Sequence, residues 1–275
     1  MNPGAASHPR IGILVVAYNA ESTLRQVLER IPPSIRSKIE EIFVFDDASQ
    51  DKTHQVGLEI QRVFEGCKLT ITKNPVNLMY GGNQRRGYRY AIERGLDIVV
   101  LLHGDGQYAP EVMQDLLTPL ETGRAEMVMG SRMMIPGAAR KGRMPLYKYL
   151  GNRILTWIQN RLTGLGLTEF HSGYRAYSVH ALASIPLENL TTNWHFDTQI
   201  ILEMARRGYR IAEVPIPTYY GDEICRVNGI PYAMHCVWET LRYALLYRGR
   251  KHAPLPAARG SAQQPSADRK ASEGV

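Results

Sequence analysis

The chain has 275 residues, of which 44% are hydrophobic and 21% charged, and its formal net charge is +7. This balance is typical of one large globular domain, and no apolar run approaches the roughly 18 to 20 residues that a membrane span requires. The first ten residues, MNPGAASHPR, lack the apolar segment of a secretory signal. Three widely spaced cysteines without a C-x-x-C pair argue against a disulfide framework and a cysteine zinc site, so we expect reduced thiols in a cytoplasmic protein.

Strand and helix patterns alternate from residue 10 to residue 130. Short apolar runs rich in β-branched residues predict strands, and apolar residues at helical spacing predict helices. The predicted strands are Ile11–Tyr18, Glu41–Phe45, Lys68–Thr72, Ile98–Leu102 and Met127–Met129, and the predicted helices are Glu21–Arg30, Thr53–Phe64, Tyr80–Arg94 and Glu111–Leu120. This order predicts an α/β fold with a mostly parallel sheet that is covered by helices on both faces.

The pattern changes after residue 130. Strands are predicted at Arg175–Ser178 and Arg210–Val214, and helices at Met144–Leu162, Asp197–Arg207 and Tyr232–Leu246. The first and the last of these helices are amphipathic. We expect residues 1–9 to be flexible, residues 10–130 and 131–248 to form two halves of one domain, and the Pro-, Ala-, Gly- and Ser-rich tail of residues 249–275 to be disordered.

Positive charge is concentrated in one stretch of the second half. Between Ser131 and Thr168 there are seven Lys and Arg residues and no Asp or Glu. Such a stretch suits a phosphate group of a nucleotide, a lipid or a membrane surface, and a merely solvated basic face is the alternative. No nucleic-acid reading motif accompanies it, so we do not expect nucleic acid as a partner.

Two acidic motifs follow predicted strands, at the edge of the sheet where ligands bind in α/β folds. In DDASQDKT, one carboxylate of the pair Asp46 and Asp47 could accept a hydrogen bond from a nucleotide base or ribose, although helix capping is the alternative. In HGDGQ, Asp105 supplies a carboxylate and Gln107 a carbonyl oxygen, which are ligands that Mg²⁺ and Mn²⁺ prefer. His103 points to the same side as Asp105 and could bind Mn²⁺ or a phosphate, and a tight turn with one exposed acid is the alternative.

Three further segments carry weaker signals. NLMYGGNQRRG places a glycine pair at a helix start, where free amides attract phosphate, although helix packing explains it equally well. TEFHSGYRAYS and NWHFDTQ place Glu169, Arg175 and Asp197 near turns. Arg175 could equally be a structural ion-pairing residue.

Taken in order, these motifs resemble those of family 2 glycosyltransferases of the GT-A fold, and within that group those of the polyprenyl-phosphate (dolichol-phosphate) sugar transferases. The similarity covers roughly residues 10–220. AYNAESTL resembles the opening P-x-YNE motif, FDDASQDKT resembles vDDgSxDxT, NLMYGGNQRRG resembles N-x-G-yGgA, HGDGQYAPE stands in the place of DADLQHPPE, GSR is retained, HSGYRAYS resembles tsGFRaysR, and HFDTQIILEMARRGYRIAEVPI resembles GFExExLxkAxxxGxxixEVPI.

The resemblance implies an inverting transfer of a sugar from a nucleotide-sugar donor to a polyprenyl phosphate at the cytoplasmic face of a membrane. Residues 10–130 would bind the nucleotide sugar and residues 131–248 would form the acceptor side, with a helical extension. The implied nucleotide-sugar residues are Tyr18, Asn19, Glu21, Asp46, Asp47, Asn77, Gly82, Gly104 and Asp105, the implied Mg²⁺ or Mn²⁺ ligands are Asp105, Gln107 and His103, and the implied catalytic residues are Asp197, Glu169, Arg132, Arg143 and Arg175.

Within the catalytic set, Arg132 and Arg143 would face the diphosphate or the acceptor phosphate, because an arginine fork suits phosphate oxygens. A lipid phosphate is already an anion and needs no strong base, whereas a hydroxyl acceptor needs one. Asp197 is the first candidate for that base and Glu169 the second. The sequence departs from the family motif at His103, which replaces the first Asp of D-x-D and so removes a carboxylate from the metal site.

The amphipathic helices around Trp157 and Trp238 could rest on a membrane, since basic and aromatic residues on one helix favour that placement. Three alternatives remain open. The acceptor could be a hydroxyl in cell-envelope polysaccharide synthesis. The chain could be a nucleotidyltransferase, although AYNAEST lacks the Gly-rich basic loop expected of that class. It could also bind nucleotides without catalysis. The sugar, the base and the oligomeric state are not determined.

Overall fold

The computed structural model describes residues 8–220 and 228–247. In this part of the chain one sheet contains seven strands, in the spatial order β3-β2-β1-β4-β6-β5-β7. The strands are β1 (Ile11–Ala17), β2 (Glu41–Asp46), β3 (Lys68–Lys73), β4 (Ile98–His103), β5 (Met127–Ser131), β6 (Arg175–Ser178) and β7 (Ile211–Pro215). The predicted tail at residues 249–275, most of the predicted flexible N-terminus and Cys225 lie outside the described residues.

The sheet is mostly parallel, as the alternating pattern predicts. β1 pairs in parallel with β2 and β4, β2 with β3, and β5 with β7. The exception is β6, which runs antiparallel between β4 and β5. The C-terminal ends of β1, β2 and β4 therefore meet at one edge, which the loops after these strands form.

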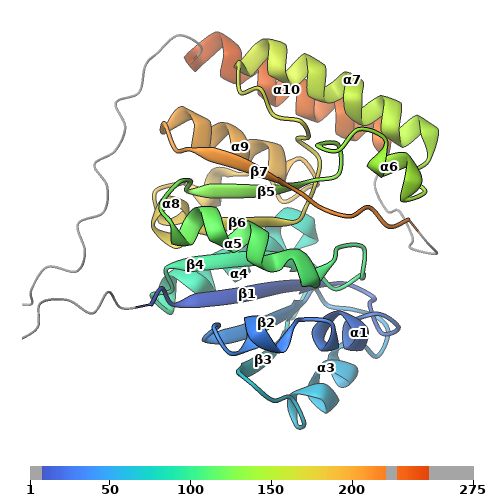
Figure 1. The fold of residues 1–275 in the computed structure, drawn as a ribbon, viewed down its shortest axis with the longest axis vertical. Coiled ribbons are helices and arrows are strands. Elements are labelled where there is room, and N and C mark those ends of the chain that lie inside the picture. Colours follow the sequence, from blue (N-terminus) through green and yellow to red (C-terminus); the bar gives the residue numbers. More distant parts are fainter. Residues whose placement is uncertain (1–7, 221–227, 248–275) are drawn as a thin grey trace, which may run out of the picture.

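Helices cover both faces of the sheet (Figure 1). Side chains of α1 (Leu24–Glu29), α2 (Pro33–Arg36), α3 (Thr53–Gln61) and α5 (Met113–Glu121) join the core on one face, and those of α4 (Met79–Glu93), α8 (Val179–Ala183) and α9 (Phe196–Arg206) join the core on the other. Two 3₁₀ turns lie at Pro110–Val112 and Leu187–Asn189. The short helices α2 and α8 are additions to the predicted elements.

Both cores arise from strands that are apolar on both faces. Ile13 and Ile42 are buried on one side of the sheet and Leu14 and Phe43 on the other, because successive side chains of a strand point to opposite faces. Helix α4 crosses β1 closely at Gly87, where an added Cβ would lie 2.3 Å from a methyl carbon of Leu14. This close approach fixes how the N-terminus of α4 meets the edge of the sheet.

The helical extension predicted for the second half corresponds to α7 (Leu146–Thr163) and α10 (Gly229–Tyr247), and the short helix α6 (Ala138–Lys141) beside it was not predicted. Figure 1 shows α7 and α10 side by side at one end of the molecule, beyond β7. Gln159 of α7 donates a hydrogen bond to Thr240 of α10 at 3.3 Å in their buried contact. No helix within residues 8–220 and 228–247 has the length and apolarity that crossing a bilayer demands.

Candidate active site

Polar residues follow β1, β2 and β4, which are neighbours in the sheet. The strand register pairs Ala17 with Asp46 and Val16 with His103, so the loops after the three strands lie at one edge. Tyr18, which is 39% exposed, follows β1 at the same edge. The structure therefore brings together the residues that the sequence assigns to a nucleotide-sugar site.

Asp46 and Asp47 are buried at the end of β2. Oδ1 of Asp46 accepts hydrogen bonds from the backbone N–H and the hydroxyl of Ser49, whereas its Oδ2 is buried without a partner in the described part of the chain. Oδ1 of Asp47 accepts from Asn74 and from the backbone N–H of Leu78, both at 2.8 Å. Burial raises the pKa of Asp47, and the charge of Asp46 acts in the same direction. The unpartnered Oδ2 of Asp46 is an acceptor that a ligand N–H or O–H would satisfy.

The loop after β1 is tied to the loop after β2. The backbone N–H of Asn19 donates to the hydroxyl of Ser49 at 2.9 Å, and Oδ1 of Asn19 accepts from the N–H of Gln50 at 2.8 Å. Glu21 accepts from the N–H of Lys52 at 3.1 Å. Asn19 also takes a left-handed conformation with φ of 49°, which Asn tolerates better than most residues. The side chains of Asn19 and Glu21 thus hold the shape of this edge.

The start of α4 completes the same edge. Nδ2 of Asn77 donates to the carbonyl oxygen of Asp47 at 3.2 Å, and Oδ1 of Asn77 accepts from the N–H of Met79 at 2.9 Å. At Gly82, an added Cβ would lie 3.5 Å from a side-chain carbon of Thr192 in the loop before α9. Asn77 therefore joins α4 to the β2 loop, and the ordinary contact with Thr192 gives Gly82 no special role in packing there. The close approach of α4 to α9 is at Gly81, where an added Cβ would lie 2.6 Å from Cβ of Phe196.

The HGDGQ turn presents a carboxylate to solvent. Gly104 packs on β1, where an added Cβ would lie 3.3 Å from the carbonyl oxygen of Val16, and Gly106 needs its positive φ of 78°. Between them Asp105 is exposed, and its Oδ1 accepts from the backbone N–H of Gln107 at 3.0 Å. No other described residue makes a hydrogen bond to the side chain of Asp105 or of Gln107, so both keep free oxygen atoms.

One ring nitrogen of His103 contacts Tyr80. Nε2 of His103 lies 3.4 Å from the hydroxyl of Tyr80, and the His103 ring meets the ring of Tyr108 edge-on with centroids 5.1 Å apart. An added Cβ at Gly173 would lie 2.6 Å from Cε1 of His103. Burial lowers the pKa of His103, and the charge of Asp105 opposes this. Because Nε2 contacts Tyr80, Nδ1 is the ring nitrogen of His103 left without a hydrogen bond to another described residue.

Asp197 occupies the first turn of α9 and is 6% exposed. Its Oδ2 accepts a hydrogen bond of 2.8 Å from the Tyr80 hydroxyl and lies 3.6 Å from Nη2 of Arg175. Its Oδ1 is buried and finds no partner among the described residues. Arg175 is fully buried and donates to the carbonyl oxygens of Ser172, Asp197 and Phe170. These contacts make Arg175 a support for Asp197, the structural role that the sequence left open, and not a group facing a ligand.

Glu169 is enclosed by an ion pair with Arg132. Its Oε1 accepts from the guanidinium of Arg132 and from Nδ2 of Asn152, and its Oε2 accepts from the backbone N–H of Arg132 at 2.7 Å. Burial opposes ionisation of Glu169, but Arg132 outweighs it and the pKa lies below the usual value. A carboxylate with both oxygens occupied is a poor proton acceptor, so the geometry favours Asp197 over Glu169 as a base.

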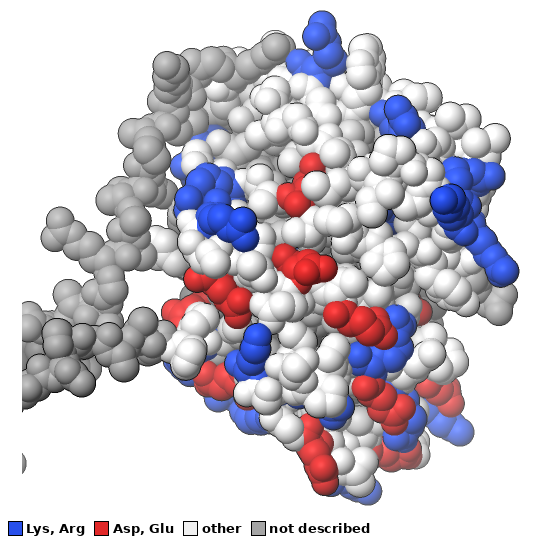
Figure 2. All heavy atoms as spheres, in the orientation of Figure 1, with Lys and Arg blue, Asp and Glu red and all other residues white. Residues whose placement is uncertain are grey.

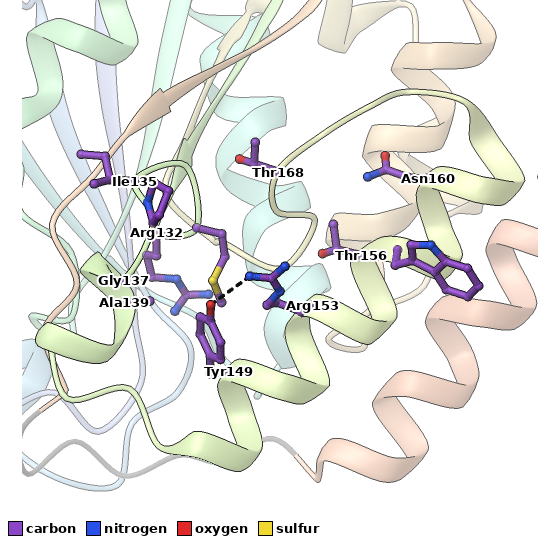
Figure 3. Close-up of a pocket in the computed structure, with 12 residues that line it drawn as sticks. Arg132, Ile135, Gly137, Ala139, Tyr149, Arg153, Thr156, Asn160 and Thr168 are labelled. Carbon is purple, nitrogen blue, oxygen red and sulfur yellow. Dashed lines mark hydrogen bonds between the residues drawn. The ribbon is translucent and has the colours of Figure 1, made fainter.

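Beyond Arg132 lies a cavity of about 340 Å³ between the loop after β5, α6 and α7 (Figure 3). Its walls combine the cations Arg132 and Arg153 with the aromatic residues Tyr149 and Trp157, and no acid lines it. Arg153 donates to the Tyr149 hydroxyl at 3.0 Å and forms no ion pair with a described residue. Arg143, which the sequence placed among the catalytic residues, does not line this cavity; it is exposed and has a positive φ of 64°.

Two parts of the site were missed by the sequence analysis. Tyr80 was counted only as part of a glycine-rich helix start, although it contacts both His103 and Asp197. Arg153 was counted only as part of the basic stretch. A signal for Arg153 existed, because it lies four residues from Tyr149 and from Trp157 on one predicted helix. Nothing local to Tyr80 indicated a partner that lies 117 residues further along the chain.

The donor atoms at the β4 turn fit a hard divalent cation such as Mg²⁺ or Mn²⁺. Asp105 offers a carboxylate and Gln107 a carbonyl oxygen, and such cations commonly take one or two protein carboxylates together with phosphate oxygens. No cluster of three or more His, Cys, Asp and Glu side chains suited to a metal occurs within the described residues. A cation held here would therefore depend on ligand phosphates for the rest of its coordination.

Comparison with known proteins agrees with this geometry. The family described as Glycosyl transferase family 2 matches residues 12–185. The undecaprenyl-phosphate mannosyltransferase of Micrococcus luteus is 30% identical over 253 residues, covering 86% of this chain and 99% of the relative. The UDP-N-acetylglucosamine–dolichyl-phosphate N-acetylglucosaminyltransferase of Methanococcus voltae is 28% identical over 222 residues, covering 77% of this chain and 86% of the relative.

Among solved structures, glucosyl-3-phosphoglycerate synthase of Mycobacterium tuberculosis in complex with Mn²⁺ and UDP-glucose superimposes with a TM-score of 0.65 at 21% identity, covering 86% of this chain and 79% of that one. At this identity the likeness supports the fold. The family match spans more than half of the chain, from β1 to the residues after α8. The protein therefore belongs to glycosyl transferase family 2 and is a glycosyltransferase.

Proposed function

We propose that this glycosyltransferase transfers a sugar from a nucleotide-sugar donor to a polyprenyl phosphate at the cytoplasmic face of a membrane, with inversion at the anomeric carbon. The observation that carries the proposal is the pairing of an exposed apolar face on α7 and α10 with the acid-free cationic cavity under α7. The names of two relatives, an undecaprenyl-phosphate mannosyltransferase and a dolichyl-phosphate N-acetylglucosaminyltransferase, support the same class of acceptor.

The exposed face of α7 and α10 suits the surface of a lipid bilayer. Trp157 on α7 is 64% exposed and Trp238 on α10 is 61% exposed, although tryptophan is usually buried. The other large exposed apolar residues of the two helices are Leu146, Tyr147, Leu150, Ile154, Ile230, Met234, Leu241, Leu245 and Leu246. In Figure 2 the end of the molecule where α7 and α10 lie carries uncharged and basic residues, and acidic residues gather lower on the face shown. Aromatic and basic residues together favour an anionic membrane surface.

The cavity suits the head of such an acceptor. Arg153 supplies a positive charge without a carboxylate partner in the described structure, and Trp157, Ile135 and Met133 supply apolar walls. A volume of about 340 Å³ is at the lower end of the range for small-molecule sites. This space would hold a phosphate and the first part of an isoprenoid chain, while the remainder of the chain follows the exposed face of α7 into the membrane.

The donor side of the proposal rests on the edge formed by β1, β2 and β4. The free Oδ2 of Asp46 would accept from the nucleotide, and Asp105 with Gln107 would hold Mg²⁺ or Mn²⁺. When bound, the cation supplies positive charge that stabilises the departing diphosphate. The free Oδ1 of Asp197 would accept from a hydroxyl of the donor sugar.

In the transfer itself, an ionised oxygen of the lipid phosphate attacks the anomeric carbon from the face opposite the nucleotide. The new bond joins that carbon to the phosphate oxygen, the bond to the diphosphate breaks, and its electron pair stays on the diphosphate. No proton needs to leave the acceptor, because a phosphate monoester is already an anion near pH 7. The chain's task is then to bind, to orient and to exclude water.

A hydroxyl acceptor is a second candidate, favoured by one observation. The unpartnered Oδ1 of Asp197 lies in the first turn of a helix, where a carboxylate could remove a proton from an attacking hydroxyl. The basic cavity and the exposed apolar face have no role in that reading, so we place it second.

The test compares acceptors that differ in one group. The purified protein is incubated with UDP-glucose, UDP-N-acetylglucosamine or GDP-mannose and Mn²⁺, together with undecaprenyl phosphate, undecaprenol or 3-phosphoglycerate. We expect product only with undecaprenyl phosphate, and NMR of that product should show the anomeric configuration opposite to that of the donor. Product on undecaprenol would favour the hydroxyl acceptor, and product on 3-phosphoglycerate would contradict a lipid acceptor.

A further inference from the structure

One carboxylate oxygen of Asp197 is held by neighbouring side chains, and the other has no partner among the described residues. Oδ2 accepts from the Tyr80 hydroxyl at 2.8 Å and lies 3.6 Å from the Arg175 guanidinium. Oδ1 is buried and unpartnered among the described residues. A buried carboxylate oxygen without a partner costs free energy unless a ligand donates to it. The orientation of Asp197 therefore decides where that donor must lie.

Tyr80 is itself held by two further aromatic side chains, Trp194 and His103. Its ring stacks on the ring of Trp194 with centroids 4.5 Å apart, and its hydroxyl lies 3.4 Å from Nε2 of His103. Gly173 leaves room for this contact, since an added Cβ there would come within 3.1 Å of the Tyr80 hydroxyl and 2.8 Å of Nε2 of His103. Burial raises the pKa of Tyr80 well above its usual value, so the hydroxyl keeps its proton and acts as a donor.

These contacts assign a direction to the chain of hydrogen bonds. The Tyr80 proton goes to Asp197, so the Tyr80 oxygen is left as an acceptor for an N–H at Nε2 of His103. The order is thus His103 to Tyr80 to Asp197. It joins the end of β4, the start of α4 and the start of α9, three elements that the sequence analysis treated separately.

We propose that Tyr80, backed by His103, is a positioning residue that fixes the Asp197 carboxylate so that Oδ1 meets a hydroxyl of the reacting sugar. The inference rests on the proposed function in one respect, which is that the partner of Oδ1 of Asp197 is a hydroxyl of the sugar. It also gives His103 a role that does not depend on a metal. Loss of the Tyr80 hydroxyl then leaves Oδ2 of Asp197 with only the 3.6 Å contact to Arg175, so the carboxylate is held less firmly and a smaller fraction of bound donor is in the reactive geometry.

The same helix offers a matched control. Tyr90 on α4 also donates a hydrogen bond of 2.8 Å to a buried carboxylate, that of Glu41, and Glu41 begins β2, at the opposite end of that strand from Asp46. Tyr80→Phe and Tyr90→Phe each remove one hydroxyl that donates a hydrogen bond of 2.8 Å to a buried carboxylate. Each hydroxyl also contacts a basic side chain, His103 at 3.4 Å for Tyr80 and Arg94 at 2.7 Å for Tyr90, so the two losses are matched. Their effects on thermal stability should be similar, whereas only Tyr80→Phe should affect turnover.

We expect Tyr80→Phe to lower kcat about tenfold, the scale of one hydrogen bond to a charged group, with KM for the nucleotide sugar changed by less than about twofold. Tyr90→Phe should keep kcat. Wild-type kcat in Tyr80→Phe, or an equal loss in Tyr90→Phe, would overturn the inference.

Two further measurements distinguish a failure of the proposed role of Tyr80 from a failure of the proposed lipid-phosphate acceptor. In a double-mutant cycle, Tyr80→Phe should cost little in the background of Asp197→Asn, because a residue that acts through Asp197 loses its effect there; full additivity would contradict the inference. The same cycle can be run on slow donor hydrolysis without any acceptor. Failure of transfer to undecaprenyl phosphate with an intact cycle in hydrolysis would overturn the acceptor proposal and leave the role of Tyr80 standing.

Discussion

Arg132, just after β5, and Glu169, six residues before β6, form a buried ion pair in which three donors of Arg132 meet one carboxylate. Arg132 is 7% exposed and Glu169 is fully buried. The pair occupies the carboxylate that the sequence offered as a second base, and it fixes the guanidinium at the wall of the cavity under α7.

Glu169→Gln should destabilise the fold strongly, because it leaves the buried Arg132 charge without a counterion. Removing one partner of a buried pair costs on the order of 3 kcal/mol in the free energy of unfolding. Urea denaturation measures the change. The matched control is Glu111→Gln, which breaks the exposed pair with Arg30 and should cost less than about 1 kcal/mol. Equal losses in the two variants would contradict a special role for the buried pair.

Asp105→Asn should lower transfer on the order of 100-fold and raise the Mn²⁺ concentration needed for half-maximal activity, because it removes the carboxylate from the proposed cation site. Asp115→Asn, at an exposed acid of α5, is the control and should change neither quantity.

His103→Asn distinguishes the two roles proposed for His103, as a metal ligand and as a support for Tyr80. Since Nε2 faces Tyr80, we expect this variant to lose turnover with its Mn²⁺ dependence unchanged. A shifted Mn²⁺ dependence would identify His103 as a ligand through Nδ1. A metal titration of activity, with melting temperatures measured in UDP and Mn²⁺, distinguishes the outcomes.

Trp157→Ser and Trp238→Ser should each weaken binding to vesicles that contain anionic lipid by about tenfold or more, since burying one large apolar side chain contributes roughly 1.5 to 3 kcal/mol. Co-sedimentation with vesicles measures the binding. Val63→Ser, at a position 71% exposed just after α3, is the control. Added salt should weaken binding of the wild type, because the basic residues contribute through screened charges. Unchanged binding in both tryptophan variants would exclude this face as the membrane contact.

Acid should destabilise the protein below about pH 6.5, the ordinary pKa of histidine. Burial lowers the pKa of His171 to about 3, and burial together with the stacked His235 lowers that of His195. Because the unfolded chain binds these protons and the folded chain does not, stability is complete above about pH 6.5 and falls as the pH drops toward 3.

Urea midpoints measured between pH 7 and pH 5 test this expectation. His171→Asn should flatten the pH dependence at some cost in stability at pH 7, because the smaller side chain leaves part of the space of the imidazole beside Tyr232 unfilled. His180→Asn, at an exposed position, should leave the slope as it is. If the urea midpoint of His171→Asn depends on pH as steeply as that of the wild type, His171 is not a source of the acid sensitivity.

Local patterns predicted most of the elements. The helix predicted at Tyr80–Arg94 is found at Met79–Glu93, and the strand predicted at Arg175–Ser178 has those bounds. Strand boundaries differ from the prediction where loop contacts end the strand. β1 ends at Ala17 and not at Tyr18, and the backbone N–H of Asn19 donates to Ser49 in the loop after β2. The antiparallel placement of β6 between β4 and β5 was not predicted, since it depends on where the chain returns to the sheet and not on the four residues of the strand.

By itself the sequence determined that apolar strands alternate with helices, that carboxylates follow two of these strands, and that the motifs stand in the order of a glycosyltransferase family. These are properties of neighbouring residues, which fix local conformation and the face to which a side chain points. Only the tertiary structure decided that Arg175 and Glu169 are enclosed by partners, that His103 contacts Tyr80, and that Oδ1 of Asp197 has no partner among the described residues. Which partner a buried charge finds is settled by packing between distant segments, because the energy of a charge depends on its surroundings in space and not on its place in the chain.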